Sequence, residues 1–372
     1  MKLAIISHTE HYKNAAGEIV GWGPTISEIN HLAKDFESIV HLAFLHNKET
    51  PPSALPYTES NIRFKALPVS GGKGLGSKLG ILTKMPATLK LINETLKEVD
   101  AFQFRAPVGM GVYIIPYLSM FSNKKGWFKY AGNWNQQQPP FGYRLQRFFL
   151  KNQQRKVTIN GAWPKQPKQC LTFENPCLTE EERALGKAII TNKNYSKPIQ
   201  FCFVGRLEDA KGVQRILDAT EKIIQETAFQ EFEVNLVGDG PKREFYEKQV
   251  KQKKLPINFK GFLNREHVFE IYKNSHAILL PSDSEGFPKV IAEAMNFACI
   301  PIVSDVSSIG QYISPTNGYL LNPINATSLQ HSMMQICTTS PEDLKRKACQ
   351  GYELTAKFTF SYYRKRIQEI LA

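Results

Sequence analysis

The 372-residue sequence lacks the marks of several common classes of protein. Its six cysteines include no C-x-x-C pair, which argues against a zinc ribbon or a disulfide framework and favours a reducing cytoplasm. The apolar N-terminal stretch is too short for the core of a signal peptide and predicts a first buried strand. The most apolar run, residues 106–121, falls short of the ~20 residues of a membrane span and contains prolines and glycines, so we expect a buried helix there.

Acidic residues are missing from one long segment. No Asp or Glu lies between Asp100 and Glu174, although eleven Arg and Lys residues do, and the formal net charge of the chain is +13. Such a field favours an anionic partner, namely lipid headgroups, a phosphorylated substrate or nucleic acid. A solvated basic surface without a specific partner is the alternative.

A complete phosphate-loop motif is also missing. The glycine-rich run at residues 70–76 has neither the GKS or GKT ending of a Walker sequence nor a full G-x-G-x-x-G pattern. We therefore interpret it as a mobile loop.

The sequence does contain short apolar runs that alternate with longer amphipathic ones, which is typical of parallel sheets covered by helices. The alternation starts twice, as expected of a chain too long for one hydrophobic core. The predicted class is α/β, with two doubly wound parallel-sheet domains at residues 1–174 and 198–356. We expect an inter-domain crossing at 175–197 and a C-terminal helix at 357–372 that packs back on the first domain.

Ligands of such sheets bind beyond the carboxyl ends of the strands, and two cations occupy one such place in the second half. Arg206 and Lys211 flank a predicted strand-to-helix loop. Free backbone N–H groups at a helix start favour an anion, and the guanidinium and ammonium groups add donors for phosphate oxygens. The alternative is that Arg206 forms an ion pair with Glu208 or Asp209.

The next strand-to-helix loop, VGDGP at residues 237–241, has glycines that permit close approach of a backbone. Pro241 suits the first position of a helix. By itself this loop is a weak signal.

Two carboxylates lie in the run SEGFPKVIAE. Pro288 is expected at the first helical position, which leaves Glu285 in the loop, where it would stabilise the helix by ~0.3–1 kcal/mol. Glu293 would share a solvated polar stripe with Lys289 and Asn296. At a rise of ~1.5 Å per residue, the backbones of Glu285 and Glu293 are ~12 Å apart. The acid and the nucleophile of a retaining hydrolase are much closer together, so these carboxylates do not fit that pair unless their side chains converge. We therefore expect the two carboxylates to hold opposite ends of one elongated ligand.

Three runs together resemble glycosyltransferase family 4, whose members are retaining enzymes of GT-B fold. They are GR-x4-KG at 205–212, VGDGP at 237–241 and PSDSEGFPKVIAEAM at 281–295, in which Glu285 and Glu293 match the E-x7-E motif of the family. The first half of the chain matches only in outline. The resemblance implies two Rossmann-like domains that face each other across a cleft, with a nucleotide-sugar donor on the second and the acceptor on the first. It implies neither a metal nor another cofactor.

The resemblance also implies roles for individual residues. Glu285, Arg206 and Lys211 would form the catalytic set, with the two cations on the donor diphosphate and Glu285 on the donor sugar. The cations and N–H groups would stabilise the charge on the departing phosphate, which itself would take the proton of the acceptor. Glu293 would bind the ribose hydroxyls. The remaining donor contacts implied are Gly205, Gly238, Phe262, Gly286, Phe287, Pro288 and an N-terminal glycine loop of Gly21, Trp22 and Gly23.

The acceptor side departs from the family pattern. Gln103 and Arg105 stand where histidines are common, and Asn133 with Trp134 replaces a His-Asp pair. The acceptor side that the resemblance implies would contain Arg105, Asn133 and Trp134 at these positions. Because aromatic residues and cations interleave at residues 141–151, we hypothesise that this face rests on an anionic membrane near a lipid-diphosphate-linked acceptor.

The predicted function is transfer of a sugar from a nucleotide sugar to a hydroxyl of a glycan or lipid-linked acceptor, with retention, in cell-surface polysaccharide or glycolipid biosynthesis. We expect a cytoplasmic location, peripheral on the inner face of the cytoplasmic membrane if lipid is bound. One alternative is a GT-B sugar-nucleotide isomerase or phosphorylase. A nonenzymatic nucleic-acid-binding protein is supported only by the net charge, and without a recognisable binding module no nucleic-acid partner is expected.

Overall fold

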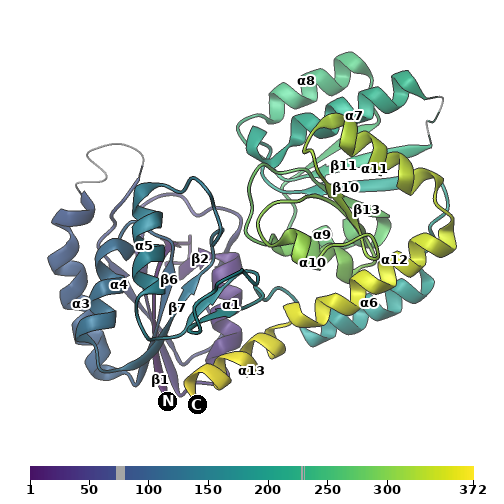
Figure 1. Cartoon of the computed structure of the whole chain (residues 1–372). Helices are drawn as coiled ribbons and strands as arrows, with labels where there is room; N and C mark the ends of the chain where they lie inside the picture. The colour runs from purple at the N-terminus through teal and green to yellow at the C-terminus, as the bar shows by residue number, and fades with distance from the viewer. Residues whose placement is uncertain (73–79, 228, 230) are drawn as a thin grey trace. The chain divides into compact units, whose positions relative to one another are not determined.

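The computed structural model describes residues 1–72, 80–227, 229 and 231–372, and it divides the chain into two compact units (Figure 1). Unit 1 is Met1–Asn175 with Phe360–Ala372, and unit 2 is Pro176–Thr359. The glycine-rich run interpreted above as a loop extends into residues 73–76, which lie outside the described residues.

Unit 1 is built on a sheet whose parallel strands lie in the order β5-β3-β1-β6-β7-β8-β9. Counted along the chain, the first six follow the order 3-2-1-4-5-6 of a doubly wound dinucleotide-binding fold. The strands are β1 (Lys2–Lys13), β3 (Ser38–Leu45), β5 (Ile62–Leu67), β6 (Ala101–Ala106), β7 (Lys125–Tyr130), β8 (Val157–Ile159) and β9 (Cys170–Thr172).

Helices cover both faces of this sheet because its central strands are continuous apolar runs, in which successive side chains point to opposite faces (Figure 1). Ala4 and Ile6 of β1 face α3 (Met85–Glu98), α4 (Gly111–Phe121) and α5 (Phe141–Lys151). Leu3 and Ile5 face α1 (Gly23–Ala33) and α13 (Phe360–Leu371). The C-terminal helix α13 thus belongs to the core of unit 1.

Within the apolar run at residues 106–121, Ala106 ends β6 and Gly111–Phe121 form α4, which is not the fully buried helix that was expected. Ile114, Ile115 and Leu118 are fully buried, whereas Met120 is 72% and Phe121 is 71% exposed. Its apolar residues therefore cover the sheet with one face and leave the C-terminal end on the surface. None of the helices in the described ranges is long and apolar enough to cross a membrane.

The predicted glycine loop at Gly21, Trp22 and Gly23 is not a loop. Gly21 and Trp22 belong to β2 (Ile19–Trp22), which pairs antiparallel with β1 and with β4 (Ala54–Pro56), and Gly23 begins α1. The physical reason is a tight turn: the Asn14 Oδ1 atom accepts hydrogen bonds from the backbone N–H groups of Ala16 (3.0 Å) and Glu18 (2.9 Å).

Unit 2 contains a parallel sheet in the order β12-β11-β10-β13-β14-β15, again 3-2-1-4-5-6 along the chain. One face packs on α7, α8 and α11, and Cys202 of β10 lies on the other face with α9. The strands are β10 (Ile199–Val204), β11 (Phe232–Val237), β12 (Ile257–Gly261), β13 (Ala277–Leu280), β14 (Ile300–Ser304) and β15 (Tyr319–Leu321). The helices are α6 (Glu180–Asn192), α7 (Val213–Glu226), α8 (Arg243–Lys253), α9 (Arg265–Asn274), α10 (Lys289–Asn296), α11 (Ala326–Thr338) and α12 (Pro341–Leu354).

The chain passes from unit 1 to unit 2 at Asn175 and Pro176, at the start of the stretch in which the crossing is expected. Most of the rest of that stretch is α6. Its start is fixed by a capping box, in which the Thr179 side chain accepts from the N–H of Glu182 and the Glu182 carboxylate accepts from the N–H of Thr179.

A buried ion cluster joins α1 to the carboxyl ends of β6 and β7 in unit 1. The Glu28 carboxylate is 3% exposed and accepts hydrogen bonds from Arg105 Nη2 (2.8 Å) and Lys129 Nζ (2.6 and 2.7 Å). Lys129 also lies 4.7 Å above the ring centre of Tyr363 in α13. One carboxylate therefore holds two buried cations on neighbouring strands.

Replacing Glu28 by Gln should lower the free energy of unfolding of unit 1 by roughly 3–5 kcal/mol, because two buried cations lose their counter-charge. Glu98→Gln is the matched control, since the Glu98 carboxylate also accepts from two cations, Arg63 and Lys65, but on the surface. Urea unfolding followed by circular dichroism should show little change for Glu98→Gln. An equal loss in both variants would contradict the structural role of the cluster.

Candidate active site

The strand order of unit 2 reverses between β10 and β13, and the loops that leave these strands lie next to each other. A ligand of an open α/β sheet binds at such a switch point. The two loops are joined by a hydrogen bond from the N–H of Asp283 to the carbonyl of Ala210 (2.9 Å). Arg215 of α7 adds a bond from its Nη1 atom to the carbonyl of Pro281 (2.8 Å).

The approach of the two loops depends on Gly212. This residue has φ +75°, and a Cβ atom on it would lie 2.0 Å from the carbonyl oxygen of Pro281. Both the left-handed backbone and the short distance exclude a larger side chain without a shift of the backbone.

The same approach brings together Lys211 and Glu285, which are 74 positions apart in the sequence. Lys211 ends the 3-10 helix at Asp209–Lys211, and its Nζ atom donates to Glu285 Oε1 at 2.6 Å. The Glu285 side chain is only 12% exposed. Two of the residues proposed as catalytic from the sequence therefore form one partly buried ion pair.

Arg206 does not join this pair. Its Nε atom lies 3.1 Å from Glu208 Oε2, and its side chain is 65% exposed. The pairing with Glu208 is the alternative considered from the sequence. An exposed guanidinium with one surface partner can turn toward a ligand at small cost.

The run Gly286-Phe287-Pro288 leads from the Glu285 loop into α10. The carbonyl of Gly286 accepts from Ser308 Oγ (3.3 Å), and Phe287 is buried against the rings of Tyr312 and Phe358. Pro288 is the N-cap residue, so α10 begins one residue later than expected, and no side chain caps it. The Phe287 side chain thus anchors the loop, and what it can offer a ligand is its backbone.

The prediction that Glu293 belongs to a solvated polar stripe is wrong. Glu293 is buried, and its Oε1 atom accepts from Arg265 Nη1 of α9 at 2.8 Å. Asn296 is also buried and donates to the carbonyl of Glu182 (2.8 Å). The stripe faces neighbouring helices, because α10 packs against α9 and α6 on that side.

Arg265 is the residue of this site that the sequence did not reveal. Its Nε and Nη2 atoms each donate to the Glu182 carboxylate at 2.9 Å, and Nη1 holds Glu293. Burial by itself lowers the pKa of Arg265, but the Glu293 and Glu182 carboxylates outweigh it, so the pKa lies above its usual value. A permanent cation therefore fixes one oxygen of Glu293. Nothing in the sequence around Arg265, which begins α9, indicated that it would contact Glu293.

Three further residues implied as donor contacts lie on loops of the same sheet edge. The N–H of Gly205 donates to the carbonyl of Val237 (3.0 Å), and that of Gly238 donates to the carbonyl of Gly261 (2.8 Å). These bonds tie the loops after β10, β11 and β12 together. Phe262, which follows β12, is 46% exposed.

The residues implied in unit 1 are more dispersed. Trp22 is the last residue of β2 and is 53% exposed. Arg105 is held in the buried cluster with Glu28, and Trp134 is buried edge-on against Tyr130. Asn133 accepts from the N–H of Asn135 (3.0 Å). Arg105 and Trp134 therefore act first as structural residues.

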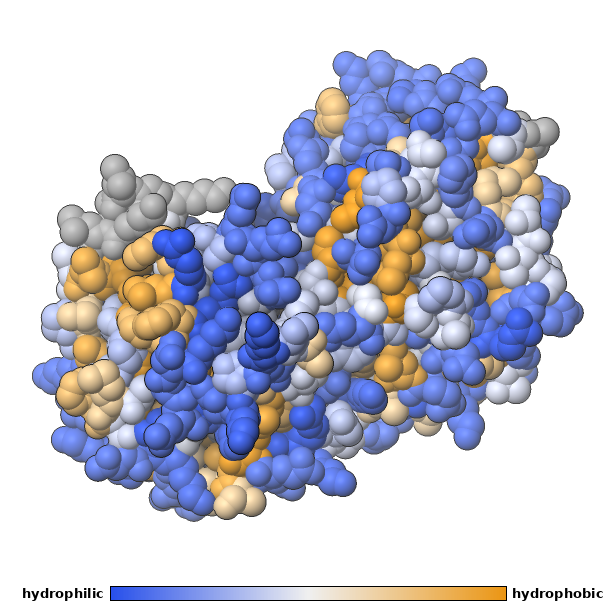
Figure 2. Space-filling view, in the orientation of Figure 1, coloured by the Kyte–Doolittle hydropathy of each residue, from blue (hydrophilic) through white to orange (hydrophobic). Residues whose placement is uncertain are grey.

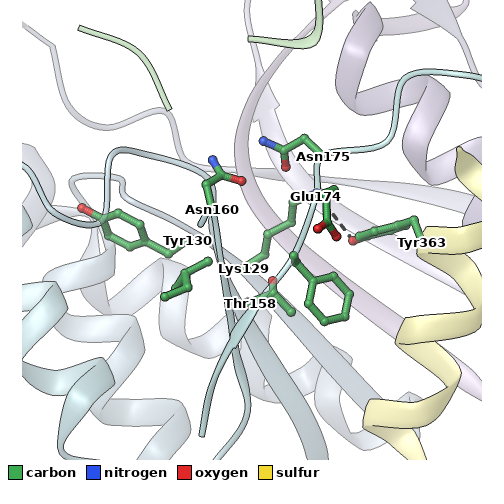
Figure 3. Close-up of a pocket in the computed structure, with 9 residues that line it drawn as sticks. Lys129, Tyr130, Thr158, Asn160, Glu174, Asn175 and Tyr363 are labelled. Atoms are coloured by element: carbon green, nitrogen blue, oxygen red, sulfur yellow. Dashed lines mark hydrogen bonds between the residues drawn. The ribbon is translucent and has the colours of Figure 1, made fainter. Parts of the chain in front are cut away.

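A pocket in unit 1 lies at the carboxyl ends of β7 and β8 (Figure 3). Lys129 Nζ donates to the hydroxyl of Tyr363 there at 3.5 Å. The hydroxyl oxygen of Thr158 is buried and has no hydrogen-bond partner. The polar residues that line the pocket are Lys129, Tyr130, Thr158, Asn160, Glu174, Asn175 and Tyr363.

Among the described residues, no group of three His, Cys, Asp or Glu side chains could hold a metal ion.

Gly212→Ala should lower the free energy of unfolding of unit 2 by roughly 1–3 kcal/mol more than Gly261→Ala, because only the former forces a Cβ atom into a backbone carbonyl. Gly261 also has a positive φ, but its nearest neighbour would be the movable guanidinium of Arg243 at 3.3 Å. Urea unfolding of both variants measures the difference. Equal losses would show that the loops do not depend on the contact with Pro281.

Residues 187–352 match the family described as Glycosyl transferases group 1. This range contains Arg206, Lys211, Glu285 and Glu293 with the strands that position them.

Several curated proteins align with parts of the chain. Lipopolysaccharide 1,6-galactosyltransferase of Salmonella typhimurium is 32% identical over 143 residues, which are 36% of this chain and 38% of that protein. Amylovoran biosynthesis glycosyltransferase AmsD of Erwinia amylovora is 28% identical over 119 residues, 32% of this chain and 33% of that protein. Uncharacterized glycosyltransferase MJ1178 of Methanocaldococcus jannaschii is 26% identical over 191 residues, 48% of this chain and 52% of that protein. The aligned part of the chain thus spans about a third to a half of these relatives.

Solved structures resemble the chain over its whole length. Sucrose-phosphate synthase (tll1590) from Thermosynechococcus elongatus gives a TM-score of 0.73 at 17% identity, covering 100% of this chain and 98% of that chain. The apo lipopolysaccharide outer core galactosyltransferase WaaB gives 0.71 at 17% identity, with coverages of 100% and 99%. Anabaena Alr3699/HepE in complex with UDP and glucose gives 0.68 at 13%, with coverages of 100% and 99%. At these identities the likeness concerns the fold: the chain has the GT-B fold, which confirms the predicted class of two Rossmann-like domains, and its residues 187–352 match the group 1 glycosyl transferases.

Proposed function

We propose that the protein is a retaining glycosyltransferase of family 4. It would transfer a sugar from a nucleotide sugar to a hydroxyl of a glycan or lipid-linked acceptor in cell-surface polysaccharide or glycolipid biosynthesis, in the cytoplasm and without a metal or other cofactor. The observation that carries the proposal is the Lys211–Glu285 pair at the switch point of unit 2, within the range that matches the group 1 family.

Lys211 and Arg206 would bind the donor diphosphate. Cleavage of the bond between the sugar and the phosphate leaves negative charge on the departing oxygen, and cations already in place stabilise that charge. The Nζ atom of Lys211 donates to Glu285, and Arg206 pairs with Glu208 on the surface. Both cations have further N–H groups that can donate to phosphate oxygens. Gly205 and Gly238 would let the diphosphate approach the backbone.

Glu285 and the loop that follows it would hold the donor sugar. Its carboxylate lies beside the ammonium group of Lys211, so sugar hydroxyls could donate to the carboxylate next to the diphosphate. The backbone N–H groups of Gly286 and Phe287 precede α10, whose helix end favours negative charge. The buried Phe287 ring supports this position of the loop.

Glu293 would bind the ribose. Arg265 fixes its Oε1 atom, so the ribose hydroxyls would donate to Oε2. Phe262, at the end of β12, would lie near the base. Phe262 directly follows β12, and Glu293 lies in α10, the helix that follows the Glu285 loop, so one elongated ligand would contact both.

The acceptor would bind unit 1. A ligand of a doubly wound sheet is expected at the carboxyl edge of its strands, and Lys129, Asn160 and Asn175 lie at this edge of unit 1 (Figure 3). The leaving phosphate would take the proton from the acceptor hydroxyl, which requires no side-chain base. The names of two relatives, a lipopolysaccharide galactosyltransferase and an amylovoran biosynthesis glycosyltransferase, support a cell-surface glycan as the product.

A thermal-shift panel of UDP, GDP, ADP, CDP and dTDP, each alone and with its common sugars, tests the donor class. A ligand that binds only the folded state stabilises it by roughly 2.7 kcal/mol at a hundredfold excess over Kd, so one nucleotide should raise the melting temperature by a few degrees. No shift with any member of the panel would contradict the proposal. Turnover of a sugar nucleotide without an acceptor would indicate an isomerase, and phosphate-dependent release of the sugar a phosphorylase.

Glu285→Gln and Lys211→Met should each lower the transfer rate by roughly 10²–10³-fold, because each removes a group that contacts the sugar or the developing phosphate charge. Lys222→Met and Glu226→Gln are matched controls, since these residues form an exposed pair at 3.5 Å near the end of α7. Initial rates with the donor identified in the panel provide the measurement. Activity like that of the unmodified protein in either site variant would refute the assignment.

The stereochemical outcome is a separate test. Retention predicts that the anomeric proton of the product has the coupling constant of the donor anomer, read by NMR of the purified product. An inverted product would leave the donor site intact and reject only the retaining mechanism.

A further inference from the structure

Helix α5 exposes one regular stripe of alternating aromatic and cationic side chains. Phe141, Arg144, Phe148 and Lys151 are all exposed and are spaced three, four and three residues apart, so they share one face of the helix. The opposite face, with Gln146 and Leu150, is buried against the unit. Phe141 is 69% and Phe148 is 59% exposed, so two large apolar side chains lie in water and alternate with two cations along the helix.

The exposed end of α4 lies next to this stripe. The two helices pack together, and the guanidinium of Arg155, just beyond α5, donates to the carbonyls of Ser122 and Lys124 at the end of α4. This places the exposed Met120 and Phe121 close to the Lys151 end of α5. Figure 2 shows apolar and strongly hydrophilic side chains next to each other over α4 and α5. We call the set Met120, Phe121, Phe141, Arg144, Phe148 and Lys151 the α4–α5 face.

The charge of this face is of one sign. The segment between Asp100 and Glu174 contains no acidic residue. Two of its cations, Arg105 and Lys129, form ion pairs with Glu28, which lies outside the segment. Arg144 lies 5.5 Å from the ring centre of Phe141, and Lys151 lies 5.6 Å from that of Trp134. Each of these two cations therefore lies near an aromatic ring of the protein.

Aromatic rings and cations in one plane fit the boundary of a bilayer, where rings enter between headgroups and cations meet lipid phosphates. We propose that the α4–α5 face binds the surface of a membrane that contains anionic lipids, and this inference rests on the proposed function, in which the acceptor is lipid-linked. A duplex nucleic acid would engage the two cations but leave the four apolar side chains in water. The face would bring unit 1, which takes the acceptor, to the lipid surface.

The test is co-sedimentation of the full chain with vesicles of phosphatidylcholine alone and of phosphatidylcholine with phosphatidylglycerol. The unmodified protein should bind the anionic vesicles and not the neutral ones. Arg144→Gln with Lys151→Gln should weaken partitioning on the order of tenfold, since each cation near an anionic surface contributes severalfold. Phe141→Ser with Phe148→Ser should weaken it as well, at any salt concentration, because it removes the apolar part.

Helix α8 of unit 2 provides the matched control. Phe245 is 53% exposed there beside Lys242, and Lys248 and Lys251 are exposed, but Glu244 and Glu247 lie among them. Phe245→Ser and Lys248→Gln with Lys251→Gln should leave vesicle binding unchanged. Equal binding to both kinds of vesicle, binding to neither, an equal loss in the α8 variants, or binding to a random oligonucleotide in place of the vesicles would overturn the proposal. If vesicle binding fails, the thermal shift that a nucleotide induces in the α5 variants shows whether the proposed function fails as well, because the donor site is proposed in unit 2.

Discussion

The contact between Gly212 and the carbonyl of Pro281 is the constraint on which the candidate active site depends. A parallel sheet places the carboxyl ends of its strands at one edge, but it does not by itself bring the loop after β10 against the loop after β13. Because Gly212 has no side chain and takes a positive φ, the two loops touch, and the hydrogen bond between Asp283 and Ala210 can form. Lys211, the neighbour of Gly212, then reaches Glu285.

Each of the two glutamates of the E-x7-E run is held by a cation, and the two pairs differ in kind. Lys211 holds Glu285 through a single ammonium group, which an anionic ligand can share. Arg265 holds Glu293 while it also binds Glu182 through two bonds, so its place is fixed by the packing of three helices. The ammonium group of Lys211 is a point charge on a flexible side chain, which suits a ligand group whose charge changes during a reaction. The planar guanidinium of Arg265 is rigid, which suits a carboxylate that only needs to be oriented.

Unit 1 uses its excess of cations in two separate ways. Arg105 and Lys129 are buried and share the Glu28 carboxylate, so their charge supports the fold. Arg144 and Lys151 are exposed on α5 beside aromatic rings, so their charge is available to a partner. The same acid-free segment supplies both sets, and burial decides which cations carry which role.

The sequence by itself determined the two parallel sheets, because buried parallel strands are short continuous apolar runs between amphipathic helices, and the turns after β10 and β13 were marked by glycine and charge. It did not show β2, whose four residues depend on a turn at Asn14, nor the burial of Glu293, because helical periodicity cannot tell solvent from a neighbouring helix. Only the tertiary structure decided that Lys211 meets Glu285, that Arg265 holds Glu293, and that Arg105 is buried beside Glu28. The pairs Lys211–Glu285, Arg265–Glu293 and Arg105–Glu28 join residues far apart in the chain. They form because of how the helices and loops pack, which a local sequence pattern does not show.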